Sequence, residues 1–239
     1  MTFAPMPRRS PGLLTRASSA FWPAVREIEA QREPHAAFWD DWNTRAFASE
    51  GPLLVALGDS SSQGIGSGDP AHSWLPRIID RLRSNTGEPW RAINLSITGA
   101  QLSDVIDFQL PRMDEMRFSG HEPTLVTHLA GANDLMAPAT WGGTARRMRT
   151  ILTALPDRAV VARVGKSTPL NGAMARMLNR IIEGQAEHRP FHLFWPWDWP
   201  SRDGLAVDRW HPGARGYEYM TDLIWGPVSE SLGISQTPR

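Results

Sequence analysis

Two short segments carry side chains that could together activate a hydroxyl group for nucleophilic attack. Ser60 comes after a Gly-Asp pair that directly follows the apolar run Leu53–Leu57, so the end of a strand would expose its hydroxyl. A serine hydroxyl is a weak nucleophile until a base removes its proton. His211 can be that base, because Asp208 lies three residues before it and can fix its tautomer within one tight loop. This spacing predicts a nucleophile, a base and an orienting carboxylate.

Two further segments could stabilise negative charge that develops during such an attack. Gly99 follows the apolar run Ala92–Leu95, and a glycine lets a backbone N–H approach a ligand closely. Asn133 follows Leu125–Leu129, and its side-chain amide can donate a hydrogen bond to an oxyanion. Each segment alone is also typical of an ordinary turn or helix cap. Their joint occurrence with Ser60 favours catalysis.

The residues around His211 leave some alternatives open. Asp198 and Asp203 lie in the same region and could also face the histidine, but the three-residue offset favours Asp208. Trp197 and Trp210 lie near this loop and could receive an acyl chain, an aromatic acid or the flat face of a sugar. The alternative for these tryptophans is a hydrophobic lid or packing in the core.

The elements that must position these residues follow from an alternation of apolar runs and amphipathic stretches after Gly51. Continuous apolar runs are typical of a parallel sheet that is covered on both faces. Five such runs separated by helices predict a three-layer α/β/α sandwich, whose sites lie at the carboxyl ends of the strands. The runs are Leu53–Leu57, Ala92–Leu95, Leu125–Leu129, Ala159–Val164 and Phe191–Trp195, and helices are expected near Trp74–Arg83, Leu102–Met113, Thr144–Leu155, Leu170–Glu187 and Gly213–Ser231.

The first fifty residues have a different pattern. Residues 1–17 are rich in Pro, Arg and Ser and are expected to form a loose arm. Residues 19–47 have helical periodicity, which Pro34 is expected to divide into two helices. We expect residues 1–50 to be an arm and helical extension that packs on a main domain of residues 51–239. An independent helical module is the alternative.

With these motifs in place, the sequence resembles the SGNH hydrolase superfamily, also called GDSL esterases and lipases. Its four blocks are matched by Gly58-Asp59-Ser60, by the segment Asn94–Gly99, by Gly131-Ala132-Asn133-Asp134, and by Asp208-Arg209-Trp210-His211. The resemblance spans roughly residues 53–230, and Ser61 departs from the leucine of the family's short name.

The resemblance implies a flavodoxin-like sheet of five parallel strands in the order 2-1-3-4-5, with no metal or organic cofactor. It implies hydrolysis of carboxylic esters of small or short-chain substrates through an acyl-serine, with an oxyanion hole made by the Ser60 N–H, the Gly99 N–H and the Asn133 amide. An acyltransferase that uses the same acyl-serine, or a catalytically silent binding module on the same fold, is the alternative.

Composition excludes several other classes of protein and kinds of site. The 239 residues carry 25 basic and 25 acidic side chains, so bulk charge attracts neither nucleic acid nor anionic lipid. The absence of cysteine excludes disulfides and thiolate sites, and no run is long enough for a transmembrane segment. No histidine or carboxylate cluster has metal-ligand spacing, and His128 is expected to be a hydrogen-bonded core residue. Without a signal-peptide pattern at residues 1–17, a cytoplasmic location is expected.

Overall fold

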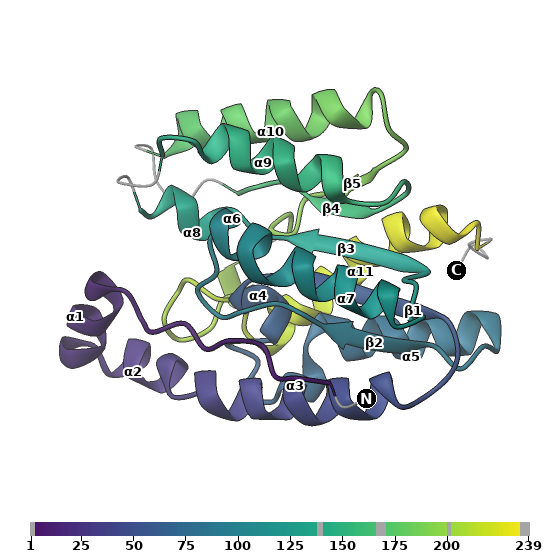
Figure 1. The fold of residues 1–239 in the computed structure, drawn as a ribbon. Helices are drawn as coiled ribbons and strands as arrows, with labels where there is room; N and C mark the ends of the chain where they lie inside the picture. Colours follow the sequence, from purple (N-terminus) through teal and green to yellow (C-terminus); the bar gives the residue numbers. More distant parts are fainter. Residues whose placement is uncertain (1–2, 138–140, 166–170, 200–201, 235–239) are drawn as a thin grey trace.

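The computed structural model describes residues 3–137, 141–165, 171–199 and 202–234. A sheet of five parallel strands runs through the molecule in the order β2-β1-β3-β4-β5 (Figure 1). Helices cover both of its faces, so the expected three-layer architecture and strand order are confirmed. The strands are β1 (Leu53–Gly58), β2 (Arg91–Asn94), β3 (Leu125–Leu129), β4 (Val160–Ala162) and β5 (His192–Phe194).

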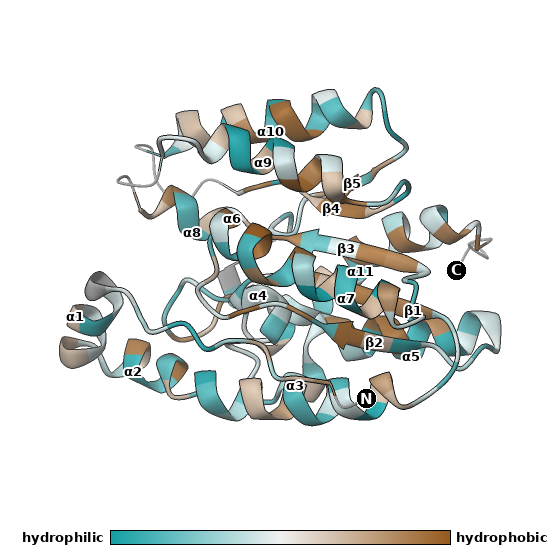
Figure 2. Cartoon of the chain, viewed as in Figure 1, coloured by the Kyte–Doolittle hydropathy of each residue, from teal (hydrophilic) through white to brown (hydrophobic). Residues whose placement is uncertain are grey.

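The strands form because their residues are apolar on both sides, as the brown central strands in Figure 2 show. In β1, Leu53, Val55 and Leu57 pack under one layer of helices, while Leu54 and Ala56 pack under the other. The helices α7 (Leu110–Phe118), α9 (Thr144–Ala154) and α10 (Gly172–Ala186) make the first layer, and α5 (Trp74–Thr86) and α11 (Ala214–Leu232) make the second. Because both faces of the sheet are covered, its strands are apolar throughout.

Short helical turns follow the strands and carry the polar motifs. They are α4 (Ser60–Gln63), α6 (Leu102–Asp104), a π-helical turn Val105–Gln109, α8 (Ala132–Leu135), and the 3₁₀ turns Pro70–His72 and Arg202–Gly204. The expected helix Leu102–Met113 is therefore interrupted by the π turn. The expected helix start at Leu170 lies outside the described residues, and α10 is described from Gly172.

The N-terminal region differs from its prediction. Its helices are α1 (Leu13–Phe21), α2 (Pro23–Glu29) and α3 (Arg32–Phe47), so the break lies before Arg32 and not at Pro34. Pro34 is in the first turn of α3, where a backbone N–H has no intrahelical acceptor and a proline costs nothing. The segment before α1 is held against the body, because Phe3 and Met6 are buried in the core.

Helix α3 lies along the outer edge of strand β2 (Figure 1). Asn43 donates to the carbonyl oxygen of Asn94 (2.8 Å) and accepts from the N–H of the same residue (2.8 Å). Trp42 donates to the carbonyl of Ala92 (3.0 Å). Side chains of α3 thus satisfy backbone groups that an edge strand would otherwise leave open.

His128 lies in the middle of β3 and is fully buried, as expected for a core residue. Neither ring nitrogen has a hydrogen-bond partner among the described residues, so the expectation of a hydrogen-bonded histidine is wrong. Burial lowers the pKa of His128 to about 4, so the ring is neutral. None of the helices in the described ranges combines the length and apolar character that crossing a bilayer requires.

Candidate active site

Ser60 lies where strand β1 turns sharply into α4. Gly58 ends the strand, and a Cβ there would sit 2.4 Å from Ser62 Oγ and 2.7 Å from the carbonyl oxygen of Leu129, so only glycine fits. Asp59 caps α4 by accepting from the Ser61 N–H (3.0 Å). Ser60 is consequently held at the carboxyl end of the strand, where it lines a cavity.

The structure brings Ser60, His211 and Asp208 together. Ser60 Oγ is 3.1 Å from His211 Nε2, and His211 Nδ1 is 2.6 Å from Asp208 Oδ2. Asp208 Oδ1 also accepts from the backbone N–H groups of Trp210 (3.0 Å) and His211 (3.1 Å). Burial opposes ionisation of Asp208, but the hydrogen bond and charge of His211 outweigh it and hold the pKa of the carboxyl below its ordinary value.

The loop that carries Asp208 and His211 is fastened at several points. Its ends pair through an isolated bridge between Leu205 and Pro212, and the Ala206 N–H donates to the His211 carbonyl (2.8 Å). A Cβ on Gly66 would lie 2.3 Å from the Pro212 carbonyl oxygen, so the segment after α4 contacts this loop directly. These contacts hold His211 beside Ser60, although 151 positions separate the two residues in the sequence.

Neither competing acidic residue pairs with His211 in the described part of the chain. Asp203 pairs with Arg215 (3.0 Å), and Asp198 lies on the cavity wall. Arg209, between Asp208 and His211, has a left-handed backbone with φ of 57° and also lines the cavity. The three-residue offset therefore identifies the carboxylate that contacts the histidine.

The three expected oxyanion donors lie on separate elements. The Ser60 N–H is at the first residue of α4, and within the described residues it donates to no acceptor. Asn133 is the second residue of α8. Its Nδ2 donates to the carbonyl of Ala100 (2.9 Å) and lies 3.5 Å from Asp59 Oδ2. A substrate oxyanion at a shorter distance is a stronger hydrogen-bond acceptor and could replace Asp59 in this long contact.

Gly99 is in a turn after β2 and has φ of 80°, which favours glycine. It is not among the described residues that line the cavity, although Ser60 and Asn133 both are. Gln63 connects its turn to α4, because Gln63 Nε2 donates to the Ser96 carbonyl (2.7 Å) and its Oε1 accepts from Thr98 Oγ (2.7 Å). The expected N–H donor is thus tied to the helix that carries Ser60.

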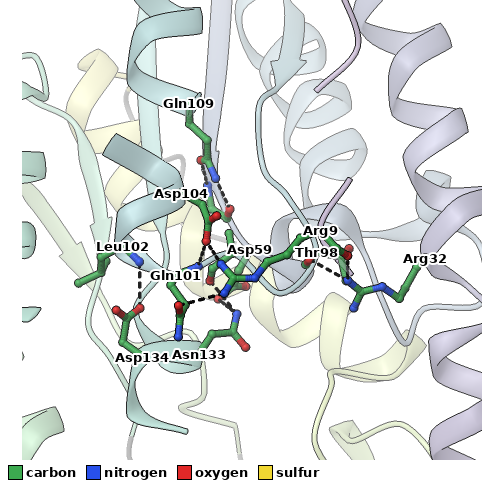
Figure 3. A network of polar contacts seen from close by, with 12 residues as sticks. Arg9, Arg32, Asp59, Thr98, Gln101, Leu102, Asp104, Gln109, Asn133 and Asp134 are labelled. Carbon is green, nitrogen blue, oxygen red and sulfur yellow. Dashed lines mark hydrogen bonds and ion pairs between the residues drawn. The ribbon is translucent and has the colours of Figure 1, made fainter. Parts of the chain in front are cut away.

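Asp59 and Asp134 are buried carboxyl groups beside these donors. Burial raises the pKa of Asp59 to about 6, although the Ser61 N–H and the charge of His211 partly offset the effect. Burial likewise raises the pKa of Asp134 to about 6, against the hydrogen bond from the Leu102 N–H (2.9 Å). Both carboxyl groups accept hydrogen bonds from backbone N–H groups beside the expected donors, and Figure 3 shows the bond between Leu102 and Asp134.

The cavity in front of Ser60 has a volume of about 550 Å³. Trp197 and Trp210, which the sequence singled out, both line it, so the alternative of core packing is wrong for them. The cavity is also lined by Gly165 and Arg209, which sequence reasoning did not single out, and by Trp195 and Trp199, which lie in the same Trp-rich segment as Trp197. The alternation of tryptophan with Pro and Asp from Trp195 onward was the available signal.

No cluster of three or more His, Asp or Glu side chains in the described ranges is arranged to hold a metal ion. The arrangement instead offers a polarised hydroxyl, an imidazole with a paired carboxylate, and hydrogen-bond donors beside a largely aromatic cavity. Such a set is suited to acyl transfer through the serine.

Comparisons with known proteins agree with this chemistry. A profile of the GDSL-like Lipase/Acylhydrolase family matches residues 56–219. A search of curated proteins gave no match.

Solved structures share the fold at low identity. TesA is 19% identical with a TM-score of 0.59, covering 75% of this chain and 99% of its own. The psychrotrophic esterase EstA from Pseudoalteromonas sp. is also 19% identical with a TM-score of 0.59. The alignment covers 76% of this chain and 98% of EstA. An acetylxylan esterase from Geobacillus stearothermophilus is 14% identical with a TM-score of 0.55. The alignment covers 78% of this chain and 96% of that enzyme. Since the family match covers more than half of the sequence, this protein belongs to the GDSL-like lipase/acylhydrolase family and is a carboxylic ester hydrolase.

Proposed function

We propose that the protein hydrolyses small carboxylic esters through an acyl intermediate on Ser60. The observation that carries this proposal is the continuous line of contacts from Ser60 Oγ to His211 (3.1 Å) and from His211 to Asp208 (2.6 Å). His211 takes the hydroxyl proton as Oγ attacks the ester carbonyl carbon. Asp208 holds the ring tautomer and offsets the positive charge that the imidazole gains.

The tetrahedral intermediate carries its negative charge on the former carbonyl oxygen. The Ser60 N–H, the Gly99 N–H and the Asn133 amide are the donors that stabilise it. His211 then gives its proton to the leaving alcohol, and the acyl-serine remains. A water molecule, deprotonated by the same histidine, attacks the acyl group, and the acid departs as Ser60 regains its proton.

The cavity supports a substrate that carries a ring. Trp197 and Trp199 pack edge to face, with ring centroids 5.2 Å apart, and Trp210 lines the same space. Indole faces bind aromatic rings and the flat faces of sugars, and about 550 Å³ exceeds what an acetyl group alone needs. The acetylxylan esterase among the similar structures acts on such a sugar ester. We therefore propose short acyl esters of sugars or aryl alcohols as substrates.

The test is a panel of esters measured on the wild type and on Ser60→Ala. The panel contains p-nitrophenyl esters of rising chain length, ethyl acetate, and an acetylated methyl xyloside. The wild type should turn over the short esters, and Ser60→Ala should lose nearly all turnover with unchanged folding by circular dichroism. Retention of most turnover by Ser60→Ala would overturn the assignment of the nucleophile.

The substrate class has its own comparison. Trp197→Ala should raise KM for the xyloside and the aryl esters more than for ethyl acetate, because only the ring-bearing substrates lose a stacking surface. Trp22→Ala removes an exposed tryptophan between α1 and α2 and serves as the control. Equal changes in KM for all esters would contradict the proposed substrate class.

A further inference from the structure

The first residues of the chain cross the body beside the turn that holds Gly99. The segment runs between α3 and the elements after β2 before it reaches α1 (Figure 1). Its anchors are Phe3 and Met6, which are 7% and 5% exposed. The Phe3 ring lies 5.8 Å from that of Phe47, and the Arg112 guanidinium covers it at 5.7 Å. This segment has a fixed course, although it lies outside the family match.

Arg9 extends from this segment to the entrance of α6 (Figure 3). Its Nη2 donates to Gln101 Oε1 (3.0 Å), and its Nη1 pairs with the Asp104 carboxylate. The same carboxylate oxygen accepts from the Gln101 N–H (2.7 Å), which closes the first turn of α6. The guanidinium therefore clamps the helix start that directly follows the Gly99 turn.

Arg32, at the start of α3, holds the other side of the turn. Its Nη2 donates to the carbonyl of Thr98 (3.1 Å) and to the carbonyl of Arg9 (2.6 Å). A Cβ on Gly99 would lie 3.6 Å from Arg32 Nη2 and 3.8 Å from Arg9 Cδ. The two arginine side chains thus pack against Gly99 and are joined to each other through a backbone carbonyl.

The clamped residues hold two of the three oxyanion donors. In the proposed mechanism Gly99 supplies one of these N–H groups. Ala100 accepts the hydrogen bond that orients the Asn133 amide (2.9 Å), and the Leu102 N–H donates to Asp134 in the same turn of α8 as Asn133 (2.9 Å). A shift of residues 98–102 would therefore move both donors together.

We propose that Arg9 and Arg32 are positioning residues that preorganise the oxyanion hole. This inference rests on the proposed function of Ser60. Donors held in place before the reaction need no reorganisation when the charge develops, and a small displacement lowers the rate of the chemical step. The N-terminal segment is then part of the catalytic unit, and it acts on kcat because neither arginine lines the substrate cavity.

The test compares Arg9→Ala and Arg32→Ala with Arg8→Ala on p-nitrophenyl acetate. Arg8 is the matched control, because it is on the same segment but pairs with Asp40 and Glu33 on α3, and it makes no hydrogen bond or ion pair with residues 98–104 in the described part of the chain. The first two variants should lower kcat by about 10–100-fold with KM changed less than about twofold, the effect of displaced reacting groups. Arg8→Ala should leave both constants within about twofold of the wild type, since exposed ion pairs contribute little.

A double-mutant cycle separates positioning from general destabilisation. If Arg9 acts through the oxyanion hole, Arg9→Ala should cost much less in an Asn133→Ala background than in the wild type. If Arg9→Ala does not fold, Arg9→Lys is compared with Arg8→Lys, because lysine keeps the charge but cannot reach Gln101 and Asp104 together.

The outcomes distinguish this inference from the proposed function. A fall in kcat for Arg9→Ala no larger than that for Arg8→Ala, or fully multiplicative effects of Arg9→Ala and Asn133→Ala, overturns the positioning role. Either result leaves the nucleophile intact as long as Ser60→Ala is inactive. Wild-type turnover in Ser60→Ala instead overturns the proposed function itself.

Discussion

The Asn133 amide has two acceptors before any substrate is present. One is the Ala100 carbonyl at 2.9 Å, which orients the side chain, and the other is Asp59 at the longer distance of 3.5 Å. The side chain is therefore anchored through Ala100, while its contact with Asp59 is long and weak enough for a stronger acceptor to replace it.

We expect Asn133→Ala to lower kcat by about 10²–10³-fold, the usual loss for one oxyanion donor. KM should change little, because the amide gains most of its interaction energy in the tetrahedral state. Steady-state kinetics on p-nitrophenyl acetate measures both constants. An unchanged kcat would remove Asn133 from the proposed oxyanion hole.

His128 is a second residue whose surroundings lead to a prediction. Both ring nitrogens are buried without a partner among the described residues, and that costs free energy that an apolar side chain avoids. His128→Leu should raise the free energy of unfolding by about 1–2 kcal/mol. Urea denaturation measures the change, and esterase turnover should stay constant because His128 does not line the cavity. A loss of stability would show that the ring packs better than leucine can.

The proximity of Asp208 and His211 was predictable because they lie three positions apart in one loop. Their meeting with Ser60 followed from the parallel sheet, whose strand ends share one edge. The contact of Arg9 with Asp104 was not predictable, because 95 positions separate two ordinary surface residue types. No spacing or periodicity signals such a pair.

Among the elements, α3 has the most specific contact with the sheet. Asn43 is 1% exposed and makes both backbone hydrogen bonds of Asn94 on the outer edge of β2. Asn43→Ala leaves a buried N–H and a buried carbonyl unpaired, so we expect the free energy of unfolding to fall by about 2–3 kcal/mol.

The adjacent Thr44→Ala is the control for this prediction, because Thr44 is exposed and its hydroxyl donates to the Asp40 carbonyl within α3. It should change stability by less than about 0.5 kcal/mol. Urea denaturation of both variants makes the comparison. Equal stability of Asn43→Ala and Thr44→Ala would mean that water replaces the edge contacts without cost.

Elements were predictable where burial dictated the pattern. The five apolar runs gave strands within a residue or two, because a strand covered on both faces must be apolar throughout. The break assigned to Pro34 was wrong, since proline disrupts a helix only beyond its first turn. The π turn at Val105–Gln109 was also unforeseen, because its helical periodicity resembles that of the flanking α-helices.

For the molecule as a whole, two buried carboxyl groups make stability depend on pH. The pKa values of Asp59 and Asp134 rise from 3.8 to about 6 on folding. Between these limits the native state keeps protons that the unfolded chain has released, so stability falls as pH rises through this window. Each such proton contributes a slope of about 1.4 kcal/mol per pH unit.

We expect Asp134→Asn to flatten this dependence, because the variant has one fewer group that titrates differently in the two states. Urea denaturation at several values between about pH 4 and pH 6 gives the slope for wild type and variant. Asp208 contributes the opposite sign in both proteins, since its lowered pKa gives stability that is lost as pH falls, and it cancels in the comparison. Identical slopes would contradict the raised pKa of Asp134.

The crossing of the N-terminal segment has a consequence for how the chain matures on the ribosome. Arg9 is synthesised long before Asp104, and the first residues must wait for their docking site to be translated. In the nascent chain, Phe3 and Met6 therefore stay exposed to solvent until the first half of the sheet is complete. If Arg9 preorganises the oxyanion hole as proposed, full activity then requires this segment to dock after residues 98–104 have been translated.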